Sequence, residues 1–255
     1  MSNVSTTREG PVLRITIDRA DKKNAITAAM YSALAAAFRS GDADAGIRAM
    51  VIHGAGDAFT AGNDLQDFLA NPPKDERDPV FGFVTGLGSI QKPLIAAVHG
   101  AAVGIGTTLL LHCDFVYATE KTRFALPFVN LGIVPEAASS YLLPLLAGHQ
   151  RAAELLLLGE PFDAAKGREI GLVNAIVAPE LLLETAMTTA RKLAERPAAA
   201  VRATKALMRR WHGPTVETAL MEEIRQFTAR LHSPEAKEAF TAFLEKRKPD
   251  FSKFD

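Results

Sequence analysis

Glu136 is the residue whose surroundings most clearly ask for a chemical explanation. It lies in the stretch NLGIVPEAASSYLLP, directly after Pro135 and otherwise mostly among apolar side chains. One interpretation is structural, because proline followed by an acidic residue is an ordinary helix start, where a carboxylate meets the positive end of the helix dipole. The other is that a reaction uses this carboxylate. Taken alone, the local sequence favours the helix start.

Two glycine-bearing turns could present backbone N–H groups to an anionic oxygen. The first, AFTAGNDLQDF, follows a predicted strand, and its Gly62 permits a backbone conformation that other residues resist. The second, VHGAAVGIGTTLLLHCD, enters a helix after Gly104 and Gly106, and free N–H groups at a helix start bind anions well. For the first turn, a simple connection capped by Asn63 or Asp64 is the plainer interpretation.

Other chemical motifs are missing from the sequence. GAAVGIG lacks the G-x-G-x-x-G spacing, and there is no G-x-x-x-x-G-K-[ST] loop, so we reject nucleotide binding by those motifs. The six histidines show no metal-ligand spacing, and we interpret His99, beside the second glycine turn, as structural. The HCD tripeptide around Cys113 lacks further ligands for zinc, so we expect no metal.

Composition narrows the class of protein. The chain has 255 residues, of which 48% are hydrophobic, enough for a sizeable core. The net charge is zero and no dense Lys/Arg run occurs, which argues against a nucleic-acid partner. We expect no membrane association, because there is no apolar signal core and no uninterrupted apolar stretch of about 20 residues. The single cysteine fits a reducing cytosol, so we expect a cytoplasmic protein.

Strand-like and helix-like segments alternate up to Pro179, which indicates an α/β plan. We expect strands within residues 12–19, 47–56, 92–100, 114–126 (two short strands) and 174–179, a helix from a Thr27 cap to a stop at Gly41, and a polar loop over 75–83. Beyond Pro179 only helix-period segments follow. We expect four helices, at 180–196, 198–211, 215–231 and 235–247, with a break at RPAAAV.

Taken together, these segments resemble the crotonase superfamily, also called the enoyl-CoA hydratase/isomerase family. The resemblance covers nearly the whole chain and rests on IDRADKKNAIT (with Ala20 where proline is usual), FTAGNDLQDF, KPLIAAVHGAAVGIGTTLLLHCD, FALPFVNLGIVPEAASSYLLPLLAG, GEPFDAAKGREIGLVNAIV and RPAAAVRATKALMR. It implies an α/β fold with a spiral core of ββα units over residues 1–195 and a C-terminal helical trimerisation region over 196–255. It also implies a homotrimer, or a hexamer built as a dimer of trimers.

The same resemblance assigns roles to individual positions. Relatives bind an acyl-CoA thioester, with coenzyme A as part of the substrate rather than a separate cofactor. The thioester oxygen accepts two backbone N–H bonds, which here correspond to Asn63 and Ile105. The implied contacts with the substrate or its CoA portion are Ala25, Ala61, Gly62, Asp64 and Leu65.

Two departures from the family pattern decide between its chemistries. Hydratases of this family use two glutamates to add water, and their positions are occupied here by Thr108 and Phe128. Neither side chain activates water well. Some Δ3,Δ2-enoyl-CoA isomerases instead carry one catalytic glutamate in an L-G-x-x-x-E-G turn, which LGIVPEAASSY resembles at Glu136. A related ring-opening isomerase has an aspartate there.

We therefore expect an isomerase that moves the double bond of a 3-enoyl-CoA to the 2-position, with Glu136 as its base. The alternatives are an isomerase that modifies the ring of an aromatic-derived CoA ester, an enoyl-CoA hydratase-like protein and a CoA-ester-binding homologue without turnover. Apolar neighbours should raise the pKa of Glu136, whereas a helix start should lower it; the sequence leaves the balance open.

Overall fold

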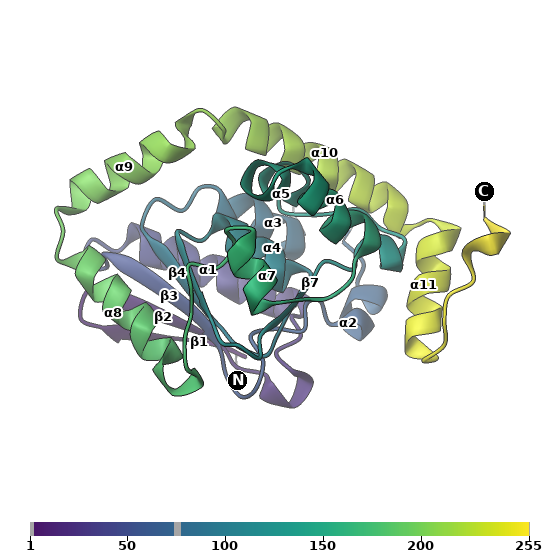
Figure 1. Cartoon of the computed structure of the whole chain (residues 1–255), viewed down its shortest axis with the longest axis horizontal. Coiled ribbons are helices and arrows are strands. Elements are labelled where there is room, and N and C mark those ends of the chain that lie inside the picture. The colour runs from purple at the N-terminus through teal and green to yellow at the C-terminus, as the bar shows by residue number, and fades with distance from the viewer. Residues whose placement is uncertain (1–2, 74–77, 255) are drawn as a thin grey trace.

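The computed structural model describes residues 3–73 and 78–254, in which helices surround two β-sheets (Figure 1). The larger sheet has the strand order β1-β2-β3-β4-β6-β9, in which β1 and β2 are antiparallel and the other pairs are parallel. Its strands are β1 (Val4–Glu9), β2 (Val12–Ile17), β3 (Ala49–Gly54), β4 (Leu94–Val98), β6 (Phe115–Ala118) and β9 (Ala175–Ile176). The smaller sheet joins β5 (Ala101–Val103), β7 (Arg123–Ala125) and β8 (Phe162–Asp163).

The larger sheet is buried on both faces, as its continuous apolar strands require. In β3, Met50 and Ile52 face the main core, whereas Ala49 and Val51 face a second cluster that includes Met187 of α8 (Leu182–Ala194). Parallel strands β3 and β4 end at the same edge of the sheet, so the two glycine-bearing turns that follow them are brought together.

The remaining helices lie around these sheets (Figure 1). They are α1 (Ala28–Ala43), α2 (Leu65–Ala70), α3 (Pro79–Leu87), α4 (Ile105–Thr108), α5 (Ser139–Ala147), α6 (His149–Leu158), α7 (Ala164–Glu169), α9 (Ala198–Arg210), α10 (Gly213–Leu231) and α11 (Pro234–Leu244). Short 3-10 turns occur at η1 (Ala20–Lys22), η2 (Leu109–His112), η3 (Val129–Leu131), η4 (Pro179–Leu181) and η5 (Phe251–Lys253).

The four helices expected after Pro179 are confirmed as α8 to α11, with the break at Pro197. Helix α9 runs along one side of the molecule, α10 crosses back over α5, and α11 lies at the opposite end (Figure 1). The α/β class and the C-terminal helical region are thus confirmed. The division at residue 195 and the trimer contacts of the tail stay predictions.

One strand was missed and two local expectations were wrong. Residues 4–9, for which we had no expectation from the sequence, form β1, an exposed edge strand whose alternation is too weak to indicate a strand. Of the predicted loop 75–83, residues 75–77 lie outside the described part, but residues 79–83 begin α3, whose Phe83 packs against Tyr31 with ring centroids 5.3 Å apart. Helix α1 does start at a Thr27 cap, yet it passes Gly41 and ends at Ala43 because that glycine packs on the sheet rather than terminating the helix.

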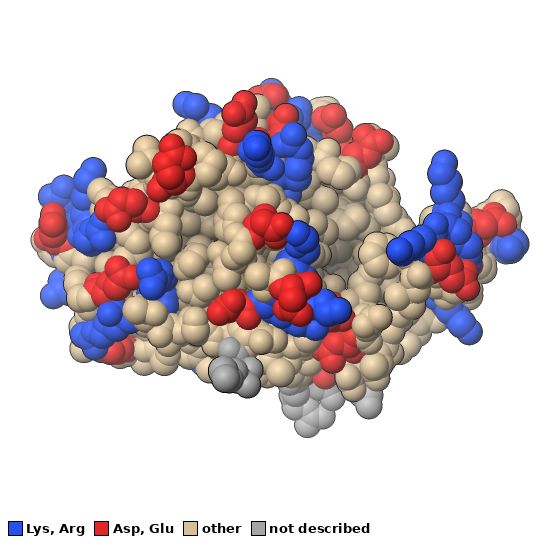
Figure 2. Space-filling view, turned by 90° about the horizontal axis from the view of Figure 1, so that it is seen from below, with Lys and Arg blue, Asp and Glu red and all other residues tan. Residues whose placement is uncertain are grey.

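Charged residues are mixed on the surface. On the face in Figure 2, basic and acidic side chains are interspersed among uncharged ones instead of gathering by sign. Within residues 3–73 and 78–254, the helices are too short or too polar to cross a bilayer. The same residues include no group of three or more His, Cys, Asp or Glu side chains that could hold a metal ion.

Candidate active site

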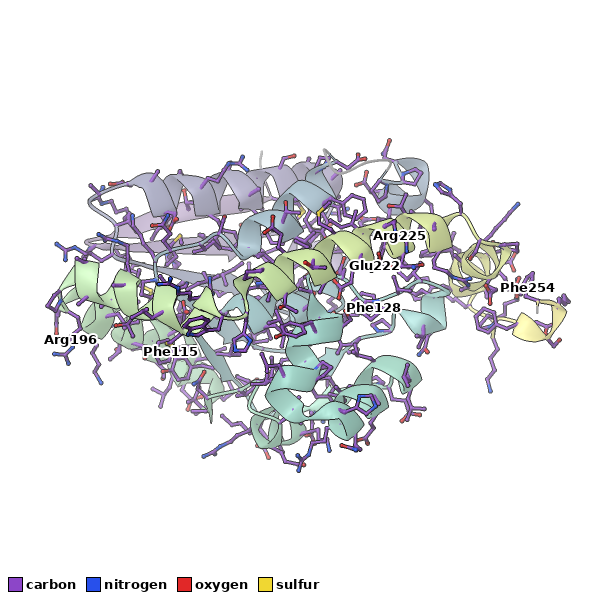
Figure 3. All side chains as sticks on the ribbon, turned by 90° about the horizontal axis from the view of Figure 1, so that it is seen from above. Phe115, Phe128, Arg196, Glu222, Arg225 and Phe254 are labelled. Carbon is purple, nitrogen blue, oxygen red and sulfur yellow. The ribbon has the colours of Figure 1, made fainter. Side chains whose placement is uncertain are left out.

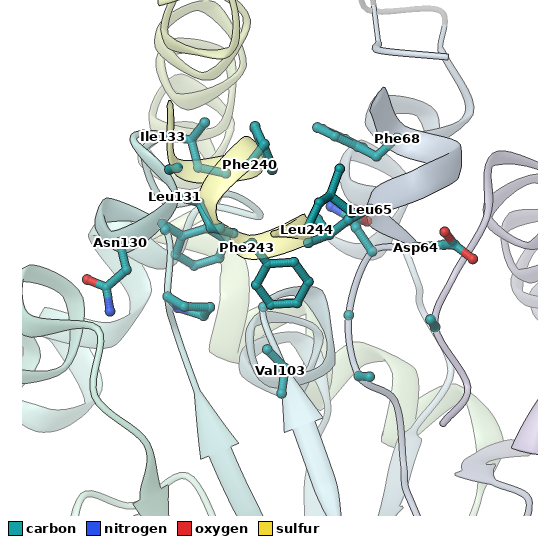
Figure 4. Close-up of a pocket in the computed structure, with 18 of the residues that line it drawn as sticks. Asp64, Leu65, Phe68, Val103, Asn130, Leu131, Ile133, Phe240, Phe243 and Leu244 are labelled. Atoms are coloured by element: carbon teal, nitrogen blue, oxygen red, sulfur yellow. The ribbon is translucent and has the colours of Figure 1, made fainter. Parts of the chain in front are cut away.

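A pocket of about 590 Å³ lies where the two glycine-bearing turns meet the segment before α5 and the helix α11. Figure 4 shows Phe243 and Leu244 of α11 facing Val103 and Leu65 across it. All the site residues proposed from the sequence line this pocket, namely Ala25, Ala61, Gly62, Asn63, Asp64, Leu65, Ile105 and Glu136. The structure therefore brings together residues up to 111 positions apart in the chain.

The two glycine-bearing turns are hydrogen-bonded to each other. Thr60 donates its N–H to the Ala101 carbonyl (2.9 Å) and accepts one from Val103 (3.0 Å). Gly62 has φ +86°, and a Cβ added there would lie 2.8 Å from the Val103 carbonyl oxygen. Glycine is needed at this position both for the backbone angle and for the close approach of the second turn.

Each of these turns has a backbone N–H group at the pocket without an acceptor in the described structure. These groups belong to Asn63 and to Ile105, the first residue of α4, and both residues line the pocket. The side chain of Asn63 accepts a hydrogen bond from the hydroxyl of Tyr31, which is buried in α1. Free N–H donors beside an apolar pocket can stabilise a developing oxyanion.

Asp64 holds the first turn in place. Its Oδ1 accepts hydrogen bonds from the backbone N–H groups of Gln66 (3.0 Å) and Asp67 (3.1 Å), which confirms it as the cap of α2. Its Oδ2 is 2.6 Å from Nη1 of Arg19. Burial alone would raise the pKa of Asp64. The bonds from Arg19 and these amides lower it by more than burial raises it, so the pKa lies below its usual value. Asp64 is therefore an ionised structural group and a poor proton acceptor.

Glu136 lies in the segment before α5 and does not start that helix. The helix begins at Ser139, after Ala137 and Ala138, which both have left-handed backbone angles; the structural interpretation of the sequence was therefore wrong. Glu136 is 5% exposed, and its Oε1 atom is buried without a hydrogen-bond partner in the described structure. Burial, and secondly the charge of Glu223, raise the pKa of Glu136 to about 8.

Thr108 and Phe128, which the resemblance places where hydratases have their two acids, differ in their surroundings. Phe128 is buried and places its ring on the pocket wall. Thr108 is fully buried in α4, is not part of the pocket lining, and its hydroxyl has no partner in the described part of the chain. The apolar ring and the buried hydroxyl are both unsuited to activating a water molecule in the pocket.

Sequence reasoning missed several residues of this site. Tyr31 is indistinguishable from a core residue in the pattern of α1, and Phe240 and Phe243 read only as the apolar stripe of α11. Glu223 contacts the Glu136 segment from α10, and no local pattern marks it. The only hint is that Glu223 lies on the apolar side of its helix, because a buried glutamate is unusual unless it has a partner.

Nearly the whole chain matches a known family. A family model described as enoyl-CoA hydratase/isomerase matches residues 7–253. The chain belongs to the enoyl-CoA hydratase/isomerase family. This confirms the resemblance to the crotonase superfamily drawn from the sequence. An acyl-CoA thioester substrate is consistent with membership of this family.

Similar proteins in this family carry different chemistries. The chain superposes on the solved structure of OdaA from Pseudomonas aeruginosa with a TM-score of 0.93 and 44% identity, covering 96% of this chain and 99% of that one. It is 34% identical to 2,3-dehydroadipyl-CoA hydratase of Escherichia coli (98% of this chain, 99% of the relative). It is 37% identical to enoyl-CoA delta isomerase 2 of Rattus norvegicus (96% of this chain, 64% of the relative). The choice between hydration and isomerisation therefore depends on the site.

Proposed function

We propose that this member of the family is an enoyl-CoA isomerase that converts a 3-enoyl-CoA into a 2-enoyl-CoA. The observation that carries the proposal is the state of the carboxyls in the pocket. Of the two that line it, Asp64 is held by Arg19 and by backbone amides, whereas Glu136 has a buried oxygen without a partner in the described structure. One unpartnered carboxyl is the minimum that a proton-transfer isomerase needs.

The reaction uses that carboxyl twice. The Glu136 carboxylate takes a proton from C2, and the electrons of the C–H bond move into the thioester, giving a dienolate whose oxygen accepts N–H bonds from Asn63 and Ile105. The Glu136 carboxylic acid then returns the proton to C4, and the double bond moves from C3–C4 to C2–C3. Atoms and charge balance without any further reactant, and preorganised donors stabilise the intermediate without reorienting.

The raised pKa of Glu136 suits this double role. A general base works best when its pKa lies near the operating pH, because it then combines basicity with a usable fraction of the ionised form. With a pKa of about 8, Glu136 is partly ionised at neutral pH and, once protonated, readily returns the proton. Asp64, whose pKa is lowered, would be the weaker base.

Hydration is disfavoured by the same surroundings. A hydratase needs a bound water held by acidic groups, and the two family positions for such groups are Thr108 and Phe128. The Phe128 ring lines the pocket together with apolar side chains from α11, such as Phe240 and Phe243 (Figure 4). Apolar walls shield the dienolate from water and leave proton return as its favoured fate.

The test compares two substrates and one variant. Wild-type protein should isomerise 3-hexenoyl-CoA and hydrate crotonyl-CoA much more slowly. Glu136→Gln, which keeps the shape of the side chain but removes the base, should lower the isomerase kcat by about 100-fold or more. The affinity for the unreactive hexanoyl-CoA, measured by calorimetry, should change little, because the N–H donors and the pocket walls remain.

Other outcomes would assign other functions. Glu136→Gln with near wild-type turnover would overturn the proposed role. Efficient hydration of crotonyl-CoA would show that another group activates water. Turnover of an epoxide or oxepin CoA ester in place of 3-hexenoyl-CoA would assign the ring-modifying reaction, and tight binding of each CoA ester without turnover would assign a binding protein.

A further inference from the structure

The turn that carries Glu136 has an unusual backbone. Ala137 and Ala138 both adopt left-handed angles, with φ of +58° and +57°. Alanine is strained in this region because of its Cβ, so two successive residues stay there only when the surroundings impose the conformation. The two strained residues directly follow the candidate base, Glu136.

Glu223 of α10 is the main group that imposes this conformation. Its Oε2 accepts the N–H of Ala138 at 2.6 Å, and its Oε1 accepts the N–H of Ser140 at 2.8 Å. A single carboxylate therefore satisfies two otherwise unpaired donors at the start of α5, from a residue 85 positions further along the chain. The Glu223 side chain is itself buried, so this is an internal brace.

A second contact holds the same turn from the opposite side. His112 of η2 donates Nε2–H to the Ala137 carbonyl at 2.7 Å. Burial lowers the pKa of His112 to about 4, so the ring is a neutral donor at physiological pH. The peptide group between Ala137 and Ala138 is thus held at its carbonyl oxygen by one helix and at its N–H by another.

The charges around Glu136 come from few groups. Glu223 on α10 and Tyr31 on α1 interact electrostatically with it, and His112 beyond the turn is neutral. Neither Glu136 nor Glu223 forms a salt bridge in the described structure. Burial raises the pKa of Glu223, and the N–H bonds that its two oxygens accept from Ala138 and Ser140 oppose that rise. The buried Glu136 oxygen accepts no such bond, so Glu223 is the more acidic of the two carboxyls.

We propose that Glu223 is a positioning residue for the isomerase, which fixes the turn that presents Glu136 to the pocket and places a second carboxylate near that carboxyl. This inference rests on the proposed function of Glu136. It makes the C-terminal helical tail part of the catalytic apparatus, because α10 supplies the brace and α11 supplies part of the pocket wall.

The test uses a matched pair of neighbouring glutamates. Glu222 lies beside Glu223 in the sequence but is exposed and paired with Arg225 on the surface of α10 (Figure 3). Glu223→Gln should lower kcat for 3-hexenoyl-CoA by about 10- to 100-fold, the range expected from a small misplacement of a reacting group. It should also move the acidic limb of the pH profile to lower pH, because the negative charge facing Glu136 is gone. Glu222→Gln should leave both unchanged.

Two further variants separate the reach of Glu223 from its charge. Glu223→Asp keeps the charge but is one methylene too short for both amides, so kcat should fall while the pH profile stays near that of the wild type. If Glu223→Gln does not fold, Ala138→Gly/Glu223→Gln relieves the strained residue and permits the same measurement. The pH profile should still move, because glycine does not restore the charge.

The inference and the proposed function fail in different ways. If Glu136→Gln is inactive but Glu223→Gln and its glycine-containing form match Glu222→Gln in kcat and pH profile, Glu223 is not a positioning residue and the proposed function stands. If Glu136→Gln keeps its activity, the proposed function itself is wrong, and the inference falls with it.

Discussion

The two sides of the pocket are built by different means. On one side, Asn63 and Ile105 offer backbone N–H groups from turns that follow adjacent parallel strands and are bonded to each other through Thr60. On the other side, Glu136 offers a side chain from a turn that is held by groups distant in the chain, including Glu223 of the tail. The first side is supported locally by the sheet, whereas the second depends on long-range packing.

This difference has a functional meaning. A proposed oxyanion site needs donors that do not move, and donors that belong to the backbone at a sheet edge are hard to displace. A proton carrier needs a tuned pKa, and a carboxyl on a strained, buried turn is more easily tuned, because burial and one neighbouring charge suffice. We call the side with the Asn63 and Ile105 donors the N–H side, and the side with the carboxyl the Glu136 side. Changes to the N–H side should affect the rate through geometry, whereas changes to the Glu136 side should also affect its dependence on pH.

The largest effect is expected on the N–H side. Ile105→Pro removes one donor at the first position of α4, where proline is tolerated in a helix. The loss of one oxyanion donor should lower kcat by about 100- to 1,000-fold. Ile105→Val is the matched control, because it keeps the N–H and most of the apolar contact. If both variants lose activity equally, the side chain of Ile105 rather than its N–H matters, and the comparison fails.

The next prediction concerns pH. If ionised Glu136 is the base, kcat/KM of the wild type should rise with pH and level off above about pH 8, because the pKa of Glu136 is raised to about 8. Below that value the loss should approach tenfold per pH unit, as for any single required ionisation. Ile105→Val should show the same midpoint, since this substitution changes no titrating group and leaves Glu136 and Glu223 in place. A profile that levels off near pH 5 would contradict the assignment.

The sequence predicted the two sides unequally, for a physical reason. The N–H side follows from short-range features, since the Gly62 turn, the Asp64 cap and the apolar strand before each turn are all visible within about ten residues. Placing these residues in one pocket required only the family resemblance and parallel strand order. Their roles in binding and in the reaction stay predictions.

The Glu136 side is less visible in the sequence. Alanine resists left-handed angles, so AASS after Glu136 is typical of a continuing helix and predicts the wrong start for α5. The conformation is imposed by contacts that no window around Glu136 contains, from His112 and Glu223. The same applies to the pKa of Glu136, which the sequence left open because it depends on burial and on the charge of Glu223, 87 positions further along the chain.

A third prediction concerns stability. A carboxyl whose pKa is raised in the folded state contributes its full stability at a pH below its unfolded-state pKa of about 4.5. This contribution is lost as the pH rises towards the folded-state pKa of about 8. Glu136→Gln removes that titration. The variant should therefore gain stability relative to the wild type between about pH 4.5 and pH 8, by at most about 1.4 kcal/mol per pH unit, and the difference should then level off. Urea unfolding at several pH values measures this, and a constant difference would show that Glu136 titrates normally.

The smallest effect is expected for a side chain that supports the N–H side from behind. Tyr31→Phe removes the hydroxyl that donates to the Asn63 side chain but leaves the backbone N–H of Asn63 in place. The ring keeps its packing against Phe83, so the fold should be preserved. Because one hydrogen bond contributes about 1 kcal/mol net, kcat/KM should fall by about fivefold or less.

The matched control for that variant is Tyr117→Phe, which removes a hydrogen bond of 2.8 Å to Thr189 on the far face of the sheet. It should lose similar stability but no activity. A fall of about 100-fold for Tyr31→Phe would mean that the Asn63 turn depends on a side-chain brace as much as the Glu136 turn does. Both sides of the pocket would then rest on distant packing. Activity equal to that of Tyr117→Phe would show instead that the bonded backbone turns alone hold the donors.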